Sequence, residues 1–129
     1  MKYKILIVLA KFYKDLSKNL IFGAKEKLNG KANIKIIEVP GSFEIPVVIS
    51  KNINNYDGFI ALGSIIKGKT PNFNFISTAI TNGLMLLSIL HKKPIGNGVL
   101  TCLNTKQARL RKNKGYEAVI AVSDIIDVK

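Results

Sequence analysis

The segment from Gly63 to Thr70 reads GSIIKGKT and fits G-x-x-x-x-G-K-T, a pattern typical of loops that bind nucleoside triphosphates. In such loops the lysine and threonine lie in the first turn of a helix, where backbone N–H groups converge on the phosphates. Here Pro71 favours a helix that starts directly after Thr70, which leaves Lys69 in the loop. Two adjacent isoleucines without an internal glycine also stiffen the loop. The segment therefore argues against a triphosphatase.

The end of this segment could still bind a single phosphate. Gly68, Lys69 and Thr70 lie between a predicted strand and a predicted helix, and they offer backbone N–H groups, an ammonium group and a hydroxyl. In an open parallel α/β sheet, ligands bind at the carboxyl ends of the strands. A structural alternative remains open, in which Gly68 only turns the chain and Thr70 only caps the helix.

Strands and helices alternate along the whole chain. Apolar runs predict strands at 3–10, 32–39, 59–63 and 96–102, and three- to four-residue periodicity predicts helices at 12–28, 42–51, 71–91, 105–112 and 115–126. Such alternation is typical of a parallel sheet that is covered on both faces. The sequence therefore predicts one α/β domain over residues 1–129, a flavodoxin-like three-layer αβα sandwich with a four-stranded parallel sheet.

Composition excludes several classes of function. The chain has a single cysteine, Cys102, which rules out an internal disulfide. Because it also has a single histidine, His91, a Cys/His zinc site is implausible, so no metal is expected. The net charge of +12 comes mostly from scattered lysines, which favours anionic substrates over nucleic acid. No uninterrupted apolar run reaches the length of a membrane span. We therefore expect a cytoplasmic protein with a buried thiol at Cys102 and a surface cation at His91.

Several segments, taken in order, resemble the 6,7-dimethyl-8-ribityllumazine synthase family. They are Lys11-Phe12, VPGSFEIPVV (39–48), ALGSIIKGKTPNFNF (61–75), GNGVLT (96–101), QARLR (107–111) and NKG (113–115). The resemblance implies condensation of 5-amino-6-(D-ribitylamino)uracil with 3,4-dihydroxy-2-butanone 4-phosphate, the penultimate step of riboflavin biosynthesis. It also implies no cofactor and a homo-oligomer, a pentamer with active sites between adjacent subunits.

The same resemblance implies roles for individual residues. The substrate-binding set for the pyrimidine and its ribityl chain is Phe12, Ser42, Phe43, Glu44, Ser64, Ile65, Ile66 and Asn97. The set that would hold the phosphate of the butanone is Gly68, Lys69, Thr70 and Arg111. Local alternatives exist for single residues, because the two phenylalanines could be core aromatics, Glu44 could favour a first helical turn, and Arg111 could be a solvated helix residue.

Two positions depart from the family pattern. The proton-transferring histidine of the family falls on Asn72, and Asn97 stands where many members carry an aromatic residue. An amide can position an oxygen atom but cannot carry a proton near neutral pH. Holding an aromatic amine against a reactive ketone accelerates their reaction by itself, so we expect a slow but real synthase in which water or Lys69 moves protons.

Two alternatives remain open beside the synthase. The chain could be a non-catalytic relative that binds a lumazine or flavin after losing the histidine, or a lysine-rich protein that binds nucleic acid. Between QARLR and NKG the chain is shorter than is usual in the family, and the first predicted strand begins almost at the N-terminus. Both regions influence assembly in the family, so we expect the pentamer rather than a larger shell.

Overall fold

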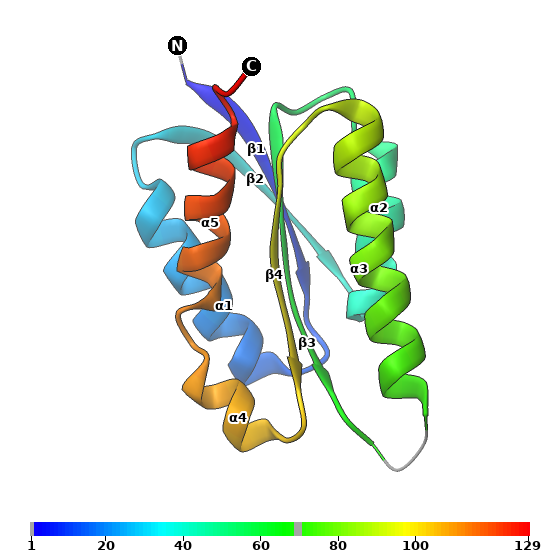
Figure 1. Ribbon diagram of the computed structural model, residues 1–129. Coiled ribbons are helices and arrows are strands. Elements are labelled where there is room, and N and C mark those ends of the chain that lie inside the picture. The colour runs from blue at the N-terminus through cyan, green and yellow to red at the C-terminus, as the bar shows by residue number, and fades with distance from the viewer. Residues whose placement is uncertain (1, 69–70) are drawn as a thin grey trace.

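The computed structural model describes residues 2–68 and 71–129. Its sheet contains four strands, which are β1 (Tyr3–Ala10), β2 (Ala32–Val39), β3 (Gly58–Ile66) and β4 (Ile95–Cys102). They lie in the order β2-β1-β3-β4, and every neighbouring pair is parallel. All four carboxyl ends therefore lie at one edge of the sheet, which is the lower edge in Figure 1.

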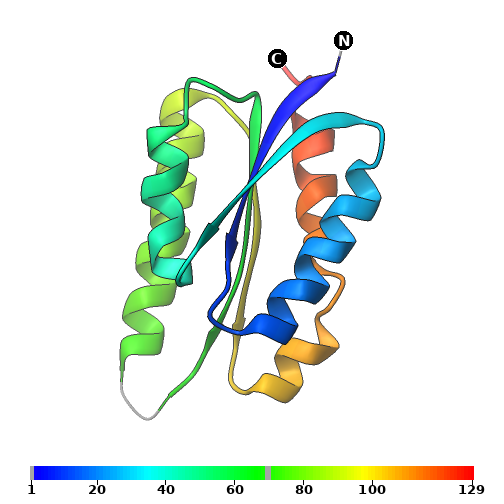
Figure 2. The ribbon, with the colours of Figure 1, turned by 180° about the vertical axis from the view of Figure 1, so that it is seen from behind.

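Helices cover both faces of the sheet (Figures 1 and 2). One layer contains α1 (Lys14–Leu28), α4 (Thr105–Leu110) and α5 (Lys114–Ile125). The other contains α2 (Ile45–Lys51), which follows the short 3-10 helix η1 (Ser42–Glu44), and α3 (Asn72–His91). The predicted three-layer sandwich with a four-stranded parallel sheet is confirmed.

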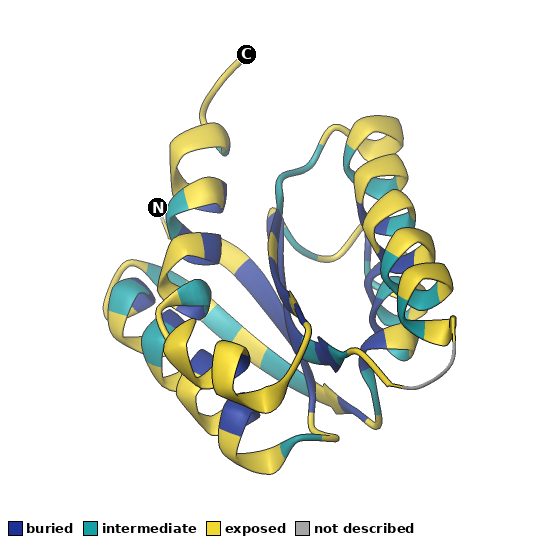
Figure 3. Ribbon diagram, turned by 60° about the horizontal axis from the view of Figure 1, so that its bottom comes forward, coloured by how far each residue is buried: buried dark blue, intermediate teal, exposed yellow. Residues whose placement is uncertain are grey.

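The two central strands divide their side chains between two apolar clusters. In β1, Ile5, Ile7 and Leu9 pack toward α1 and α5, whereas Leu6 and Val8 pack toward α2 and α3. Both sets are buried, which explains why the strand reads as an almost continuous apolar run. Figure 3 shows the buried residues concentrated on the strands and on the inner sides of the helices.

The structure corrects the predicted end of β3. The strand was predicted to end at Gly63 but continues to Ile66, since Ser64, Ile65 and Ile66 pair with Leu100 to Cys102 of β4. β-Branched isoleucines stiffen a phosphate-binding loop but are well suited to a strand. Half of the GSIIKGKT segment is thus extended backbone that cannot wrap around a triphosphate.

Several helix ends also differ from the predicted ones. Helix α1 begins at Lys14 rather than residue 12, and α3 begins at Asn72, so Pro71 precedes the helix instead of being its first residue. The Pro71 carbonyl accepts hydrogen bonds from the N–H groups of Asn74 and Phe75. The predicted cap at Thr70 lies outside the described residues. Helices α4 and α5 end at Leu110 and Ile125, which are differences of one or two residues.

Helix α3 exposes much of its apolar surface. Only Ile80 and Leu84 are buried, and the large exposed side chains are Phe75, Met85, Leu86, Ile89 and Leu90. By length and composition alone the helix could cross a membrane, and only 11% of its most apolar window is buried. Soluble proteins that expose an apolar surface of this kind use it as an interaction site.

Close packing of α5 against α1 generates a prediction about stability. A Cβ atom at Gly115 would clash with the carbonyl oxygen of Leu20 and lie 2.9 Å from its carbonyl carbon. Because backbone atoms cannot rotate out of the way, Gly115→Ala is expected to lower the free energy of unfolding by about 2–3 kcal/mol. Urea denaturation at matched protein concentration measures this change.

Gly68→Ala is the matched control, because a Cβ atom at Gly68 meets nothing within 4 Å. Its free energy of unfolding should stay within about 0.5 kcal/mol of that of the wild-type protein. Equal stability of the two variants would contradict the close α1–α5 approach.

Candidate functional site

A hollow of about 290 Å³ lies at the carboxyl edge of the sheet. Three segments that are far apart in sequence form most of it: the β1–α1 connection, η1 with the residue before it, and the end of β3. Its lining residues are Phe12, Tyr13, Gly41, Ser42, Phe43, Ser64, Ile65, Ile66 and Ile76. Six of the eight residues predicted to bind the pyrimidine substrate therefore lie around one hollow.

Two aromatic side chains of the hollow are largely solvent-exposed. Phe12 is 68% exposed and Phe43 is 61% exposed, so neither belongs to the core. The ring of Phe12 packs edge-to-face against Tyr13, with ring centroids 4.9 Å apart and an interplanar angle of 75°. Exposed aromatic faces at a concave surface can stack against a planar ring.

The end of β3 offers free backbone groups to this hollow. Strand β3 pairs with β1 only as far as Leu62, whereas its pairing with β4 continues to Ile66. The N–H of Lys67 donates to Cys102 of β4 at 2.9 Å. Because backbone groups alternate between the two sides of a strand, those of Ser64 and Ile66 point to the side that β1 has left open.

Ser42 holds η1 against this open side of β3. Its buried hydroxyl donates a hydrogen bond of 3.5 Å to the carbonyl oxygen of Ser64. The same hydroxyl lies so close to Gly63 that a Cβ atom there would clash with it. Glycine at position 63 is therefore what allows the PGS turn to approach the strand.

Glu44 has a structural contact rather than a place in the hollow. Its Oε1 atom accepts a hydrogen bond of 3.0 Å from the backbone N–H of Gly41, which closes the turn at the start of η1. The half-buried carboxylate does not line the hollow. This contact orients the segment that carries Ser42 and Phe43.

Among the residues that the structure describes, the Ser64 hydroxyl has no hydrogen-bond partner. Its Oγ atom is buried, and no residue in the described ranges 2–68 and 71–129 bonds to it. Buried hydroxyl groups in folded proteins are nearly always hydrogen-bonded. Because Ser64 lines the hollow, a ligand or a water molecule could supply the missing partner.

The start of α3 borders the hollow. Asn72 is exposed at the first position of the helix, and Ile76, which lines the hollow, follows one turn later. Gly68 is exposed at the other end of this connection. Lys69 and Thr70, which were predicted to bind phosphate, lie outside the described residues.

Two predicted site residues lie elsewhere in the same chain. Arg111 is exposed at the end of α4, in the helical layer opposite α3, and it does not line the hollow. Asn97 is exposed on β4 opposite Ala61, and its Oδ1 atom accepts a hydrogen bond from Val99 N–H at 3.0 Å. One chain alone does not bring these two residues to the hollow.

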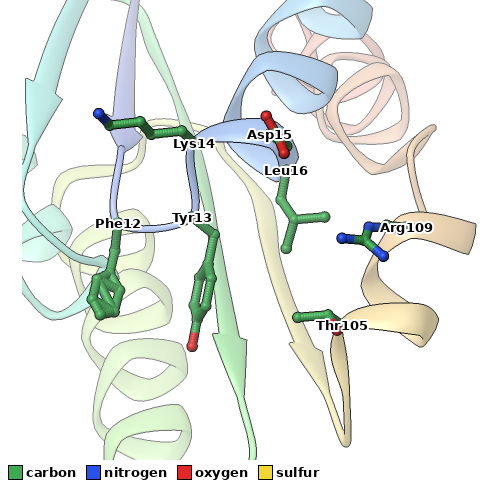
Figure 4. A pocket seen from close by; sticks show the side chains of 7 residues that line it. All are labelled: Phe12, Tyr13, Lys14, Asp15, Leu16, Thr105 and Arg109. Carbon is green, nitrogen blue, oxygen red and sulfur yellow. The ribbon is translucent and has the colours of Figure 1, made fainter.

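A second hollow of about 270 Å³ adjoins the first, and its lining residues are Phe12, Tyr13, Lys14, Asp15, Leu16, Thr105 and Arg109. Figure 4 shows the rings of Phe12 and Tyr13 side by side below the β1–α1 connection, with the Arg109 side chain extending from α4. Tyr13 lines both hollows. Tyr13 was not among the site residues predicted from the sequence, although its position next to Phe12, directly after a buried strand, could have indicated it.

Potential metal ligands and thiols do not gather at this edge. Within the described part of the chain, no group of three or more His, Cys, Asp or Glu side chains could hold a metal ion. Cys102 is buried and free, as predicted. The side chains that line the two hollows offer aromatic rings, hydroxyls, the cations of Lys14 and Arg109 and the carboxylate of Asp15.

Comparison with known proteins gives a consistent result. The model of the family described as 6,7-dimethyl-8-ribityllumazine synthase matches residues 2–129. A 6,7-dimethyl-8-ribityllumazine synthase of Agrobacterium fabrum is 39% identical, and the match covers 99% of this chain and 95% of the relative. Proteins of the same name from Leuconostoc mesenteroides and Sulfurimonas denitrificans are 37% and 34% identical, with 97% of this chain covered and 87% and 88% of the relatives. This chain belongs to the 6,7-dimethyl-8-ribityllumazine synthase family.

Proposed function

We propose that this protein is a 6,7-dimethyl-8-ribityllumazine synthase of riboflavin biosynthesis, formed by one domain over residues 1–129. It condenses 5-amino-6-(D-ribitylamino)uracil with 3,4-dihydroxy-2-butanone 4-phosphate to give 6,7-dimethyl-8-ribityllumazine, phosphate and water. Beside family membership, the observation that carries this proposal is the hollow at the carboxyl edge of the sheet. Three segments that resemble family motifs meet there.

The hollow suits a planar pyrimidine with a polar chain. The exposed ring of Phe12 stacks on the pyrimidine, and Phe43 covers an adjoining part of the site. The open backbone groups at Ser64 and Ile66, with Ile65 between them, bond to the polar edge of the ring. Glu44 holds the turn that carries Ser42, Ser42 contacts the ribityl chain, and the Ser64 hydroxyl gains a partner.

The phosphate of the second substrate binds beside the start of α3. Gly68, Lys69 and Thr70 lead into this helix, and the first N–H groups of a long helix attract an anion. Arg111 supplies the planar guanidinium group that suits a phosphate. Because Arg111 and Asn97 lie away from the hollow of their own chain, a second subunit contributes them.

The protein forms a homo-oligomer, and a pentamer is the assembly that we favour. The apolar side chains along α3 are exposed in one chain, and a second subunit covers them. The polar side chains of Asn74, Ser77, Thr81 and Ser88 on the same helix favour an interface between subunits in the cytoplasm over a membrane span.

A two-substrate assay tests the proposed function directly. Purified protein is mixed with the ribitylaminouracil and the butanone phosphate, and lumazine formation is followed by absorbance. We expect a rate above the uncatalysed background, because the site holds both reactants together even with Asn72 at the position of the family histidine. If both substrates bind but lumazine forms only at the uncatalysed background rate, the protein is a non-catalytic relative.

Asn72→His separates a slow enzyme from such a relative. The substitution places an imidazole at the start of α3, one turn from Ile76 of the hollow, where it can transfer protons. We expect kcat to rise several-fold, with KM changed by less than about twofold. Asn74→His, an exposed position on the same helix, is the control and should leave kcat unchanged.

Arg111→Ala tests the phosphate site and its sharing between subunits. We expect KM for the butanone phosphate to rise about 10- to 100-fold, while KM for the pyrimidine changes little, because the lost contact is to the phosphate. Lys112→Ala removes a neighbouring exposed cation and serves as the control.

Mixed oligomers extend this test. Arg111→Ala subunits co-assembled with Phe43→Ala subunits should recover part of the activity, since some interfaces would then contain two intact halves. Activity that stays at the mean of the two variants would place Arg111 in the site of its own chain.

A further inference from the structure

We propose that Tyr13 is a catalytic residue of this enzyme and that its phenol hydroxyl carries protons between the amine and the ketone. This inference rests on the proposed synthase function and names the group that replaces the absent histidine. Tyr13 lines the hollow together with Phe12, Ser42 and Ser64. It is therefore placed to contact the reacting atoms of a substrate bound there.

The main chain and the ring of Tyr13 are both held in place. Its carbonyl oxygen accepts a hydrogen bond of 2.9 Å from Ser17 N–H, which makes Tyr13 the residue that precedes α1. The Ser17 hydroxyl also donates to the carbonyl of Ala10 at 2.6 Å and so fastens α1 to the end of β1. The half-buried ring packs on the apolar cluster below α1 and against Phe12. A group held in this way keeps its hydroxyl at a defined place.

The other groups that line the hollow are poorer proton carriers. The Ser42 hydroxyl already donates to Ser64, and the Ser64 hydroxyl is buried. None of the described residues that line the hollow carries a carboxylate, and the Glu44 carboxylate accepts a hydrogen bond from the Gly41 N–H. Tyr13 is half-buried and lines the hollow, and its phenol hydroxyl can both donate and accept a hydrogen bond.

The histidine of the chain cannot act in this hollow within one subunit. His91 is the last residue of α3, whereas Ile76, near the first turn, is the residue of α3 that lines the hollow. A helix of 20 residues is about 30 Å long, so His91 and the hollow lie near opposite ends of α3. A phenol at the hollow is therefore better placed than the imidazole.

The proton relay balances at each step. The aromatic amine adds to the ketone carbon, so a C–N bond forms as the C=O π bond breaks, and the oxygen takes the proton of the phenol. One proton of the amine nitrogen then passes to the phenolate. Next, the phenol protonates the new hydroxyl, which leaves as water while the C=N bond forms, and the remaining N–H proton restores Tyr13. Tyr13 therefore regains its proton after the addition and again after the loss of water.

Tyr13→Phe tests this role while keeping the ring and its packing. We expect kcat to fall about 10- to 100-fold, with KM for both substrates within about twofold and the urea midpoint unchanged. Adding Asn72→His to Tyr13→Phe should restore most of the lost turnover, because a second proton carrier then borders the hollow. Tyr116→Phe, which removes a half-exposed phenol on α5, is the control and should keep wild-type kcat.

The outcomes distinguish this inference from the function on which it rests. An active wild-type protein with an equally active Tyr13→Phe variant would overturn the role of Tyr13 and leave the synthase function intact. A loss that appears only in KM would also overturn it, because the hydroxyl would then bind substrate without moving protons. A wild-type protein at the background rate would overturn both.

Discussion

The candidate site exists because β3 continues beyond Leu62, which is its last residue that pairs with β1. From Gly63 to Ile66 the strand keeps only its β4 partner, so one side of its backbone is left for other groups. Ser42 approaches this side because position 63 carries no side chain, and it bonds to the Ser64 carbonyl. The remaining open backbone becomes the floor of the hollow. A longer β1 would have closed it.

The connection between β1 and α1 provides the wall of the hollow. Ser17 bonds to both ends of this connection, through its hydroxyl to Ala10 and through its N–H to Tyr13. Two aromatic rings are thereby held at a position where a loop would otherwise move. Exposed aromatic rings lose hydrophobic stabilisation in the free protein, and a bound planar ligand recovers it. The stability that the free protein loses by exposing these rings is typical of a binding surface.

The exposed apolar surface of α3 and the position of Arg111 both support the proposed assembly of several subunits. The exposed residues of α3 form a surface that water solvates poorly, while Arg111 stands on the opposite layer with no place in the hollow of its own chain. The proposed assembly, which would bury α3 and bring a neighbour's α4 to the hollow, would account for both features. In the proposed assembly, the net charge of +12 would favour the binding of a phosphorylated substrate.

The sequence by itself determined the alternation of strands and helices, because apolar runs and helical periodicity report which faces are buried. Its ordered motifs also indicated six of the residues that line one hollow, whereas the predicted Glu44 and Asn97 do not line it. Tertiary structure decided where β3 ends, since pairing with β4 outweighed the local turn signal at Gly63. It also left the Ser64 hydroxyl without a partner among the described residues and placed Tyr13 at one hollow with η1 and the end of β3. Those outcomes depend on contacts between segments distant in the chain, which local patterns do not encode.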